Sequence, residues 1–202
     1  MKTPGLSHSD SARGDLGGNP NSGLGHKPTM KVIGVVGLNG SGKDEVVDYL
    51  HERYGVAKLS MGDMVREIAE EQGLAPTRDN LHRLSEQYFS ERGRDYFAKR
   101  AIQTIENHDW ETAAISGIRT PTDVETLQQH FGDDFALVHV SVSDPQTRYQ
   151  RIRDRRQARD PQSYSEFLQH DREEEEIFHL SHTIQEADIV LNNDESLAQL
   201  HR

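Results

Sequence analysis

The chain has 202 residues, with 23 lysines and arginines against 34 aspartates and glutamates, and a formal net charge of −11. Its length suggests one domain of ordinary size, and the lack of cysteine excludes disulfides, thiolate metal sites and a cysteine nucleophile. No apolar run approaches the roughly 20 residues of a membrane span, and the excess of carboxylates argues against binding a long nucleic acid. We therefore expect a soluble, cytoplasmic protein whose partner is neither a membrane nor a long nucleic acid.

Residues 1–29 are rich in glycine, proline, serine and asparagine and contain no aromatic residue. Such a segment cannot bury enough apolar surface to offset its loss of conformational entropy. It also lacks the apolar core of a secretory signal. We predict a disordered tail over 1–29 and a folded domain over 30–202, and Met30 could be an alternative start.

From residue 31 on, short apolar runs alternate with polar stretches of helical length. The first run, 31–36, is almost entirely apolar, as a strand buried on both faces should be. The other predicted strands are 56–60, 112–116, 135–142 and 188–191. This alternation predicts an α/β fold with a parallel central sheet and helices on both faces.

Three of the predicted helices have recognisable starts. Thr120 is followed by proline, a pair typical of an N-cap and a first helical residue. Ser143 with Gln146, and Ser163 with Glu166, have the spacing of a capping box.

The first predicted strand leads into Gly37-Leu38-Asn39-Gly40-Ser41-Gly42-Lys43-Asp44. This octapeptide fits the phosphate-binding pattern G-x-x-x-x-G-K, with aspartate where serine or threonine is usual. Its glycines allow backbone N–H groups to surround phosphate oxygens, and the following helix directs its positive end at the same anion. We predict that all eight residues bind ATP and that Lys43 contacts the β- and γ-phosphates.

Asp44 is the unusual residue of this loop. The usual hydroxyl binds Mg²⁺, and a carboxylate is a hard oxygen ligand that could replace it. It could equally repel the triphosphate unless a metal is present. Asp44 is our candidate magnesium ligand, and the motif alone leaves both interpretations open.

After the second predicted strand the sequence reads Ser60-Met61-Gly62-Asp63-Met64-Val65-Arg66. It resembles the S-T-G-D-x-L-R segment of adenylate kinase, a nucleoside monophosphate kinase. The resemblance implies that Ser60, Met61 and Gly62 line the acceptor base pocket and that Arg66 binds the acceptor phosphate.

Arg66 and Asp63 each have a second interpretation. Arg66 can present a bidentate fork to a phosphate, or it could pair with Glu67 or Glu70 on a solvated helix. Asp63, which we include among the acceptor-binding residues, could orient metal-bound water or cap the helix that follows.

Residues 115–121 read I-S-G-I-R-T-P and resemble the D-G-F-P-R-T segment of adenylate kinase. The resemblance implies that Arg119 is a second, catalytic arginine on the acceptor phosphate. Ser116, however, stands where the family has a Walker-B-type aspartate. A hydroxyl cannot supply the charge that holds Mg²⁺ or its waters, so Asp44 or Asp63 would have to do so.

Six arginines occur close together: Arg148, Arg151, Arg153, Arg155, Arg156 and Arg159. Monophosphate kinases close an arginine-bearing lid over the transferred phosphoryl group. By that resemblance Arg155, Arg156 and Arg159 are catalytic, and the four-residue spacing of Arg155 and Arg159 predicts a shared helix face. The alternative is a solvated helix whose arginines are offset by Asp154 and Asp160.

Residues 186–197 resemble the ending of dephospho-CoA kinases and of an uncharacterised archaeal nucleotide-kinase-like family. That loop passes the adenine in related folds, so Asn192 and Asn193 are candidate base contacts, although a plain turn would look similar. The acidic run 173–176 is most simply a solvated helix face, and chance explains the metal-like spacing of His179 and His182.

The matched segments follow one another along the chain in the same order as in the family, and they span about residues 31–200. The resemblance implies a three-layer P-loop fold with acceptor-binding helices over about 62–108 and a lid over about 151–161. It further implies a kinase that transfers the γ-phosphate of ATP, with Mg²⁺, to a small phosphorylated, nucleotide-like acceptor. The alternative is an ATP-binding switch with weak or no kinase activity, which Asp44 and Ser116 favour.

Overall fold

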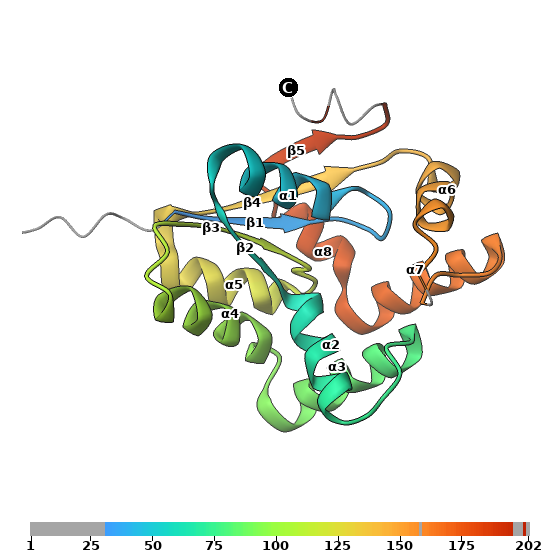
Figure 1. The fold of residues 1–202 in the computed structure, drawn as a ribbon, viewed down its shortest axis with the longest axis horizontal. Helices are drawn as coiled ribbons and strands as arrows, with labels where there is room; N and C mark the ends of the chain where they lie inside the picture. The colour runs from blue at the N-terminus through green and yellow to red at the C-terminus, as the bar shows by residue number, and fades with distance from the viewer. Residues whose placement is uncertain (1–30, 158, 196–199, 201–202) are drawn as a thin grey trace, which may run out of the picture.

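The fold is built around a sheet in which every strand pairing is parallel. The structure, a computed structural model, describes residues 31–157, 159–195 and 200 (Figure 1). The strands lie in the order β2-β3-β1-β4-β5. They are β1 (Lys31–Val36), β2 (Ala57–Ser60), β3 (Thr112–Ser116), β4 (Phe135–Ser141) and β5 (Ile189–Asn192). All the predicted strands are confirmed, and no strand end differs from its prediction by more than one residue.

Helices cover both faces of this sheet (Figure 1). They are α1 (Lys43–Tyr54), α2 (Met61–Glu71), α3 (Arg78–Arg92), α4 (Tyr96–Asn107), α5 (Pro121–Phe131), the 3-10 turn η1 (Gly132–Asp134), α6 (Pro145–Arg155), α7 (Tyr164–Phe178) and α8 (Leu180–Gln185). Helix α1 packs against β1 and β3, whereas α5 packs on the other face against β1 and β4, with α4 and α8 beside it. The predicted three-layer α/β P-loop fold is therefore confirmed.

Side chains that alternate along β1 contribute to both layers of the core. Val35 packs with Val46 and Val47 of α1. Val32 and Val36 belong to the larger apolar cluster on the opposite face. Because β1 is central and buried on both faces, its carboxyl end lies in the middle of the sheet edge, where the P-loop begins.

Two further pairs of helices lie beyond the carboxyl edge of the sheet (Figure 1). Helices α2 and α3 form one pair, and α6 and α7 form the other. Helix α3 also contacts α7, so the two pairs meet. The site at the end of β1 is therefore bordered by helices far apart in the sequence.

One predicted helix start differs from the structure. The capping side chain of α6 is Asp144, which accepts from the backbone N of Gln146 at 3.0 Å, so the capping box predicted at Ser143 is wrong. The Ser143 hydroxyl instead donates to the Asp194 carboxylate at 2.8 Å, so it does not cap the first turn of α6. The N-caps predicted at Thr120 and Ser163 are confirmed. The capping box predicted at Ser163 is half formed, because the Glu166 carboxylate accepts from the backbone N of Gln162 instead of that of Ser163.

Helix α6 also ends earlier than expected. It stops at Arg155, because Arg156 adopts a left-handed conformation with φ of 53°. The prediction that Arg155 and Arg159 share a helix face is therefore wrong. The chain turns instead around Asp160, whose carboxylate accepts from Arg155 Nε at 2.9 Å and from the backbone N of Gln157 at 2.7 Å.

The predicted disordered tail over 1–29, and Met30, lie outside the described residues. The segment 62–108, predicted to bind the acceptor, contains α3, α4 and most of α2, and 151–161 contains the end of α6 and the turn after it. Within the described ranges, no helix is long and apolar enough to cross a membrane.

Candidate functional site

The P-loop joins β1 to α1 in a tightly packed conformation. Gly40 and Gly42 have φ of 78° and 95°, which favour glycine. A Cβ at Gly40 would lie 2.6 Å from the carbonyl oxygen of Arg148, and one at Gly42 would lie 2.4 Å from Nδ2 of Asn193. Both glycines are therefore required by their neighbours as well as by their backbone angles.

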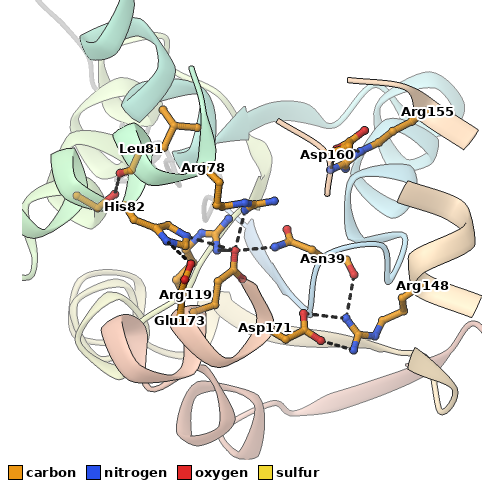
Figure 2. A network of polar contacts seen from close by, with 12 residues as sticks. Asn39, Arg78, Leu81, His82, Arg119, Arg148, Arg155, Asp160, Asp171 and Glu173 are labelled. Atoms are coloured by element: carbon orange, nitrogen blue, oxygen red, sulfur yellow. Dashed lines mark hydrogen bonds and ion pairs between the residues drawn. The ribbon is translucent and has the colours of Figure 1, made fainter. Parts of the chain in front are cut away.

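Side chains of α6 and α7 hold this loop from outside. The side chain of Asn39 donates through Nδ2 to Oε1 of Glu174 at 2.6 Å. The backbone carbonyl oxygen of Asn39 accepts from Nη1 of Arg148 at 3.1 Å. Arg148 is fixed in turn by Asp171, which accepts from both terminal nitrogens, at 3.1 and 2.6 Å (Figure 2). The shape of the P-loop therefore depends on α7, which lies far away in the sequence.

Glu174 lies at the centre of the polar network. Its side chain is only 1% exposed, and its Oε1 also accepts from Nη1 of Arg78 and Nη1 of Arg119, each at 2.8 Å. Burial alone would raise the pKa of Glu174, but the charges of Arg119 and Arg78 hold it well below the ordinary value. The prediction that 173–176 is a solvated helix face is therefore wrong at Glu174.

Two open cavities border the P-loop. The first lies between the loop, α2 and α3, and its space is about 630 Å³ with open solvent included. Its charged lining residues are Lys43, Asp44, Arg66, Arg78, Arg119, Arg155 and Arg159. The second lies between the loop, α6 and the segment after β5, and its space is about 1150 Å³ with open solvent included. Because Lys43, Asp44, Arg155 and Arg159 line both, the two cavities meet at these four side chains.

Lys43 and Asp44 begin α1 at this meeting point. Burial lowers the pKa of Lys43. The charge of Lys43 lowers the pKa of Asp44, and a hydrogen bond between the Asp44 carboxylate and the side chain of Ser116 acts in the same direction. Asp44 is therefore ionised at neutral pH, and the nearly inaccessible Ser116 is its direct neighbour.

Arg159 lies partly buried among other arginines. Burial lowers its pKa to about 10, and the charges of Arg66, Arg155 and Arg78 act in the same direction. Among the described residues, no ion pair joins Arg159 to a carboxylate: Asp160 pairs with Arg155, and Glu174 pairs with Arg78 and Arg119. The positive charge of Arg159 is therefore available to an anion.

Most of the residues predicted for the site come together. The first cavity is lined by Asn39, Lys43, Asp44, Ser60, Gly62, Arg66, Arg119, Arg155 and Arg159, and the second by Gly40 and Gly42. Met61 lines a third cavity of about 310 Å³, which shares Gly62 and Arg119 with the first. The third cavity is largely apolar, with Phe89, Phe97 and Phe178 in its wall.

Six of the predicted residues line none of these cavities: Gly37, Leu38, Ser41, Asp63, Arg156 and Asn192. Leu38 packs against the hydrophobic core, and Arg156 is exposed after the end of α6. Asp63 forms an ion pair with Arg66, which therefore pairs with neither of the glutamates considered as alternatives. Asp63 does not cap α2 either, because the cap is Ser60, whose hydroxyl accepts from the backbone N of Asp63 at 3.2 Å.

Of the two asparagines predicted as base contacts, Asn193 lines the second cavity and Asn192 does not. Asn192 is exposed and donates to Asp194 at 2.7 Å. Asn193 lines the second cavity, and its Nδ2 donates to the carbonyl oxygen of Ser41 at 2.7 Å. Gly37 packs inside the loop, where a Cβ would lie 2.5 Å from Oγ of Ser41.

Sequence reasoning did not assign site roles to Glu174 or Arg78. Glu174 lies seven residues after Phe167 and four before Phe178, and all three are buried on α7. That spacing places the glutamate on the apolar face of the helix, so helical periodicity was the signal that could have found it. Arg78 begins α3 after the cap at Thr77 and carries no comparable signal.

Comparisons with known proteins show the family to which the chain belongs. The family described as "AAA domain" matches residues 36–167. A UPF0200 protein of Thermococcus sibiricus is 33% identical over 175 residues, which are 85% of this chain and 90% of that protein. The chain belongs to the UPF0200 family. The predicted membership of an archaeal nucleotide-kinase-like family is therefore confirmed.

The chain itself also shares its fold with solved kinases. Shikimate kinase from Acinetobacter baumannii in complex with shikimate matches with a TM-score of 0.50 and 19% identity, over 85% of this chain and 88% of that one. A sugar kinase from Janibacter matches with a TM-score of 0.52 and 13% identity, over 85% and 90%. At these identities the likeness shows the fold alone: the UPF0200 chain has the three-layer α/β fold of P-loop kinases.

Proposed function

We propose that this protein is a kinase that transfers the γ-phosphate of ATP, with Mg²⁺, to a small phosphorylated, nucleotide-like acceptor. The observation that carries the proposal is the meeting of two cavities at Lys43, Asp44, Arg155 and Arg159. A donor in one cavity and an acceptor in the other would bring their phosphates together among these charges. Holding two reactants in this way supplies much of the rate of a phosphoryl transfer.

The second cavity is the donor side in this proposal. The P-loop backbone and the positive end of α1 would hold the phosphates of ATP, with Lys43 on the β- and γ-phosphates. Asn193 lies in the wall of this cavity and holds the loop through Ser41. The adenosine part would then lie along this wall of the cavity, beside Asn193.

The first and third cavities form the acceptor side. Arg66 and Arg119 line the first cavity and would bind the acceptor phosphate through their planar forks. The aromatic residues of the third cavity would contact an apolar or planar part of the same molecule. Phe178 lies under the guanidinium of Arg119, 5.1 Å from it, so the two parts of the acceptor site are continuous.

Transfer itself would depend on charge and position. An acceptor phosphate is already nucleophilic at neutral pH, so no general base is needed, and Arg155 and Arg159 would stabilise the charge of the transferred group. Asp44 fits as a holder of Mg²⁺, because it is an ionised carboxylate that lines both cavities. When bound, the metal would neutralise charge on the β- and γ-phosphates.

Coupled assays with ATP, Mg²⁺, nucleoside monophosphates and dephospho-CoA test the proposal. We expect phosphoryl transfer to at least one acceptor and its loss in Lys43→Ala, with Lys58→Ala on the exposed surface as the matched control. Arg66→Lys should lower kcat/KM for the acceptor by roughly 100-fold, because lysine cannot form the bidentate contact, whereas Arg83→Lys should not. No transfer to any acceptor, although Lys43→Ala abolishes ATP binding, would exclude the kinase.

That outcome would favour the second candidate function, an ATP-binding switch. The observation behind it is Ser116, a hydroxyl where related kinases carry an acidic metal-binding residue. A switch would bind ATP and hydrolyse it slowly without an acceptor. Its binding to a partner would differ between the ATP and ADP states, which a kinase does not require.

A further inference from the structure

One carboxylate oxygen beside the third cavity is buried without a partner. Asp123 lies in the first turn of α5 and is only 3% exposed. Its Oδ2 accepts from the backbone N of Thr120 at 3.0 Å and from that of Arg119 at 3.4 Å. Its Oδ1 is buried too, and none of the described residues donates a hydrogen bond to it. A buried acceptor without a donor is costly to the fold, so its presence calls for an explanation.

The cap of α5 fixes the orientation of this carboxylate. Thr120 and Asp123 form a complete capping box, in which the Thr120 hydroxyl accepts from the backbone N of Asp123 at 3.1 Å. Oδ1 therefore cannot turn toward another donor unless the cap breaks. Burial raises the pKa of Asp123, and the hydrogen bonds from Thr120 and Arg119 offset only part of that effect. A further N–H donor at Oδ1 would stabilise the ionised carboxylate.

The third cavity is the place from which a ligand could supply that donor. Asp123 lines it together with three phenylalanine side chains, so a planar ring fits its walls. Ser85 lines it as well, and because the Ser85 hydroxyl donates to the carbonyl oxygen of Leu81 at 2.9 Å, its remaining lone pairs can only accept. The guanidinium of Arg119 in the same wall disfavours a cationic group. The walls therefore suit a neutral ring that carries N–H donors.

We propose that Oδ1 of Asp123 accepts a hydrogen bond from an amino group on the ring of the acceptor, and that the protein thereby selects amino-bearing bases. Adenine, guanine and cytosine carry such a group. Uracil and hypoxanthine carry carbonyl oxygens instead, and a carbonyl oxygen against Oδ1 would leave two buried acceptors facing each other. The inference rests on the acceptor site of the proposed function, but it concerns binding and does not require phosphoryl transfer.

Calorimetric titration of the full chain with matched nucleoside monophosphates tests this. AMP and GMP are each compared with IMP, and CMP is compared with UMP, because the members of each pair differ at an amino group. In the pair that contains the tightest ligand, we expect the amino-bearing member to bind at least about tenfold more tightly, as for a hydrogen bond to a charged acceptor. This comparison needs only the natural protein.

Asp123→Asn tests whether this residue is the source of the preference. The amide oxygen of asparagine can keep the two hydrogen bonds of the cap, and its amide nitrogen then replaces the free acceptor by a donor. We expect the preference to disappear or to reverse in favour of IMP or UMP, which a purely structural role would not produce. Asp144→Asn removes the same charge at the cap of α6, away from the three cavities, and should leave the preference unchanged.

The results separate the inference from the proposed function. If the members of every pair bind equally, if the carbonyl-bearing members bind more tightly to the natural protein, or if Asp123→Asn keeps the natural preference, the role of Asp123 is wrong while the acceptor site stands. If none of the five monophosphates binds, the proposed nucleotide-like acceptor fails, and the inference fails with it.

Discussion

At the scale of single residues, the polar network depends on one buried carboxylate, Glu174. It accepts hydrogen bonds from Asn39, Arg78 and Arg119, which belong to three different segments of the chain. Removing one partner from a buried ionic group is far more destabilising than removing a surface pair, because the other charges remain without compensation. Glu174 thus fixes two arginines of the first cavity and the P-loop together.

The first prediction concerns the stability of this network. Glu174→Gln keeps the size of the side chain but removes the charge that compensates Arg78 and Arg119. We expect the free energy of unfolding to fall by about 3 kcal/mol, measured by urea denaturation. Glu176→Gln, on the exposed side of the same helix, should change it by less than about 0.5 kcal/mol. Equal losses in the two variants would contradict the role given to Glu174.

The second prediction is the pH dependence of the same contact. The pKa of Glu174 is well below its ordinary value of 4.5 in the folded protein. A depressed carboxyl pKa contributes stability that is complete above the ordinary pKa and is lost as the pH falls toward the folded value. The natural protein should therefore lose its advantage over Glu174→Gln as the pH falls below about 4.5. A difference that stays constant down to pH 3 would contradict this.

At the scale of elements, α7 connects the P-loop, the acceptor side and α6. Asp171 and Glu174 are one turn apart on this helix, and they reach the P-loop through Arg148 and directly through Asn39. Helix α3 contacts the same helix. A movement of α7 would therefore change both cavities at once.

The third prediction tests this connection at Asp171. Asp171→Asn leaves the buried Arg148 without its charge partner, so the loop should be held less firmly. We expect a loss of about 2 kcal/mol in stability and a roughly tenfold weaker binding of ATP, by thermal unfolding and calorimetry. Asp154→Asn, on the exposed part of α6, is the matched control. Unchanged ATP binding in a destabilised Asp171→Asn would show that the contact supports the fold alone.

The elements also show why sequence reasoning succeeded at some places and failed at others. The strands and the P-loop follow from local patterns, namely apolar runs and glycine spacing, which do not depend on distant contacts. The end of α6 depends on a local contact that helical spacing does not reveal. Asp160 binds Arg155, five residues before it, and the backbone N of Gln157, so the chain leaves the helix after Arg155. Arg159 still reaches both cavities, but from a turn.

At the scale of the whole molecule, the parallel sheet gathers the site from segments far apart in the sequence. The carboxyl ends of β1, β2 and β3 carry the P-loop, the start of α2 and the Ser116–Arg119 turn, as expected for ligand sites in open α/β sheets. Only such long-range packing places Glu174 between Arg78 and Arg119, so no local pattern could predict that contact. Although the chain is acidic overall, six of its 23 lysines and arginines line the first cavity, and Asp44 is the one carboxylate among the residues that line it.

The central claim is that the two cavities hold a donor and an acceptor whose phosphates meet. The most direct measurement is phosphorus nuclear magnetic resonance of ATP, Mg²⁺ and the protein, with each member of a library of nucleoside monophosphates and dephospho-CoA. The account predicts that at least one acceptor gains a phosphoryl group while ATP becomes ADP, without release of inorganic phosphate. ATP that is only hydrolysed, at the same rate with and without every acceptor, would contradict it.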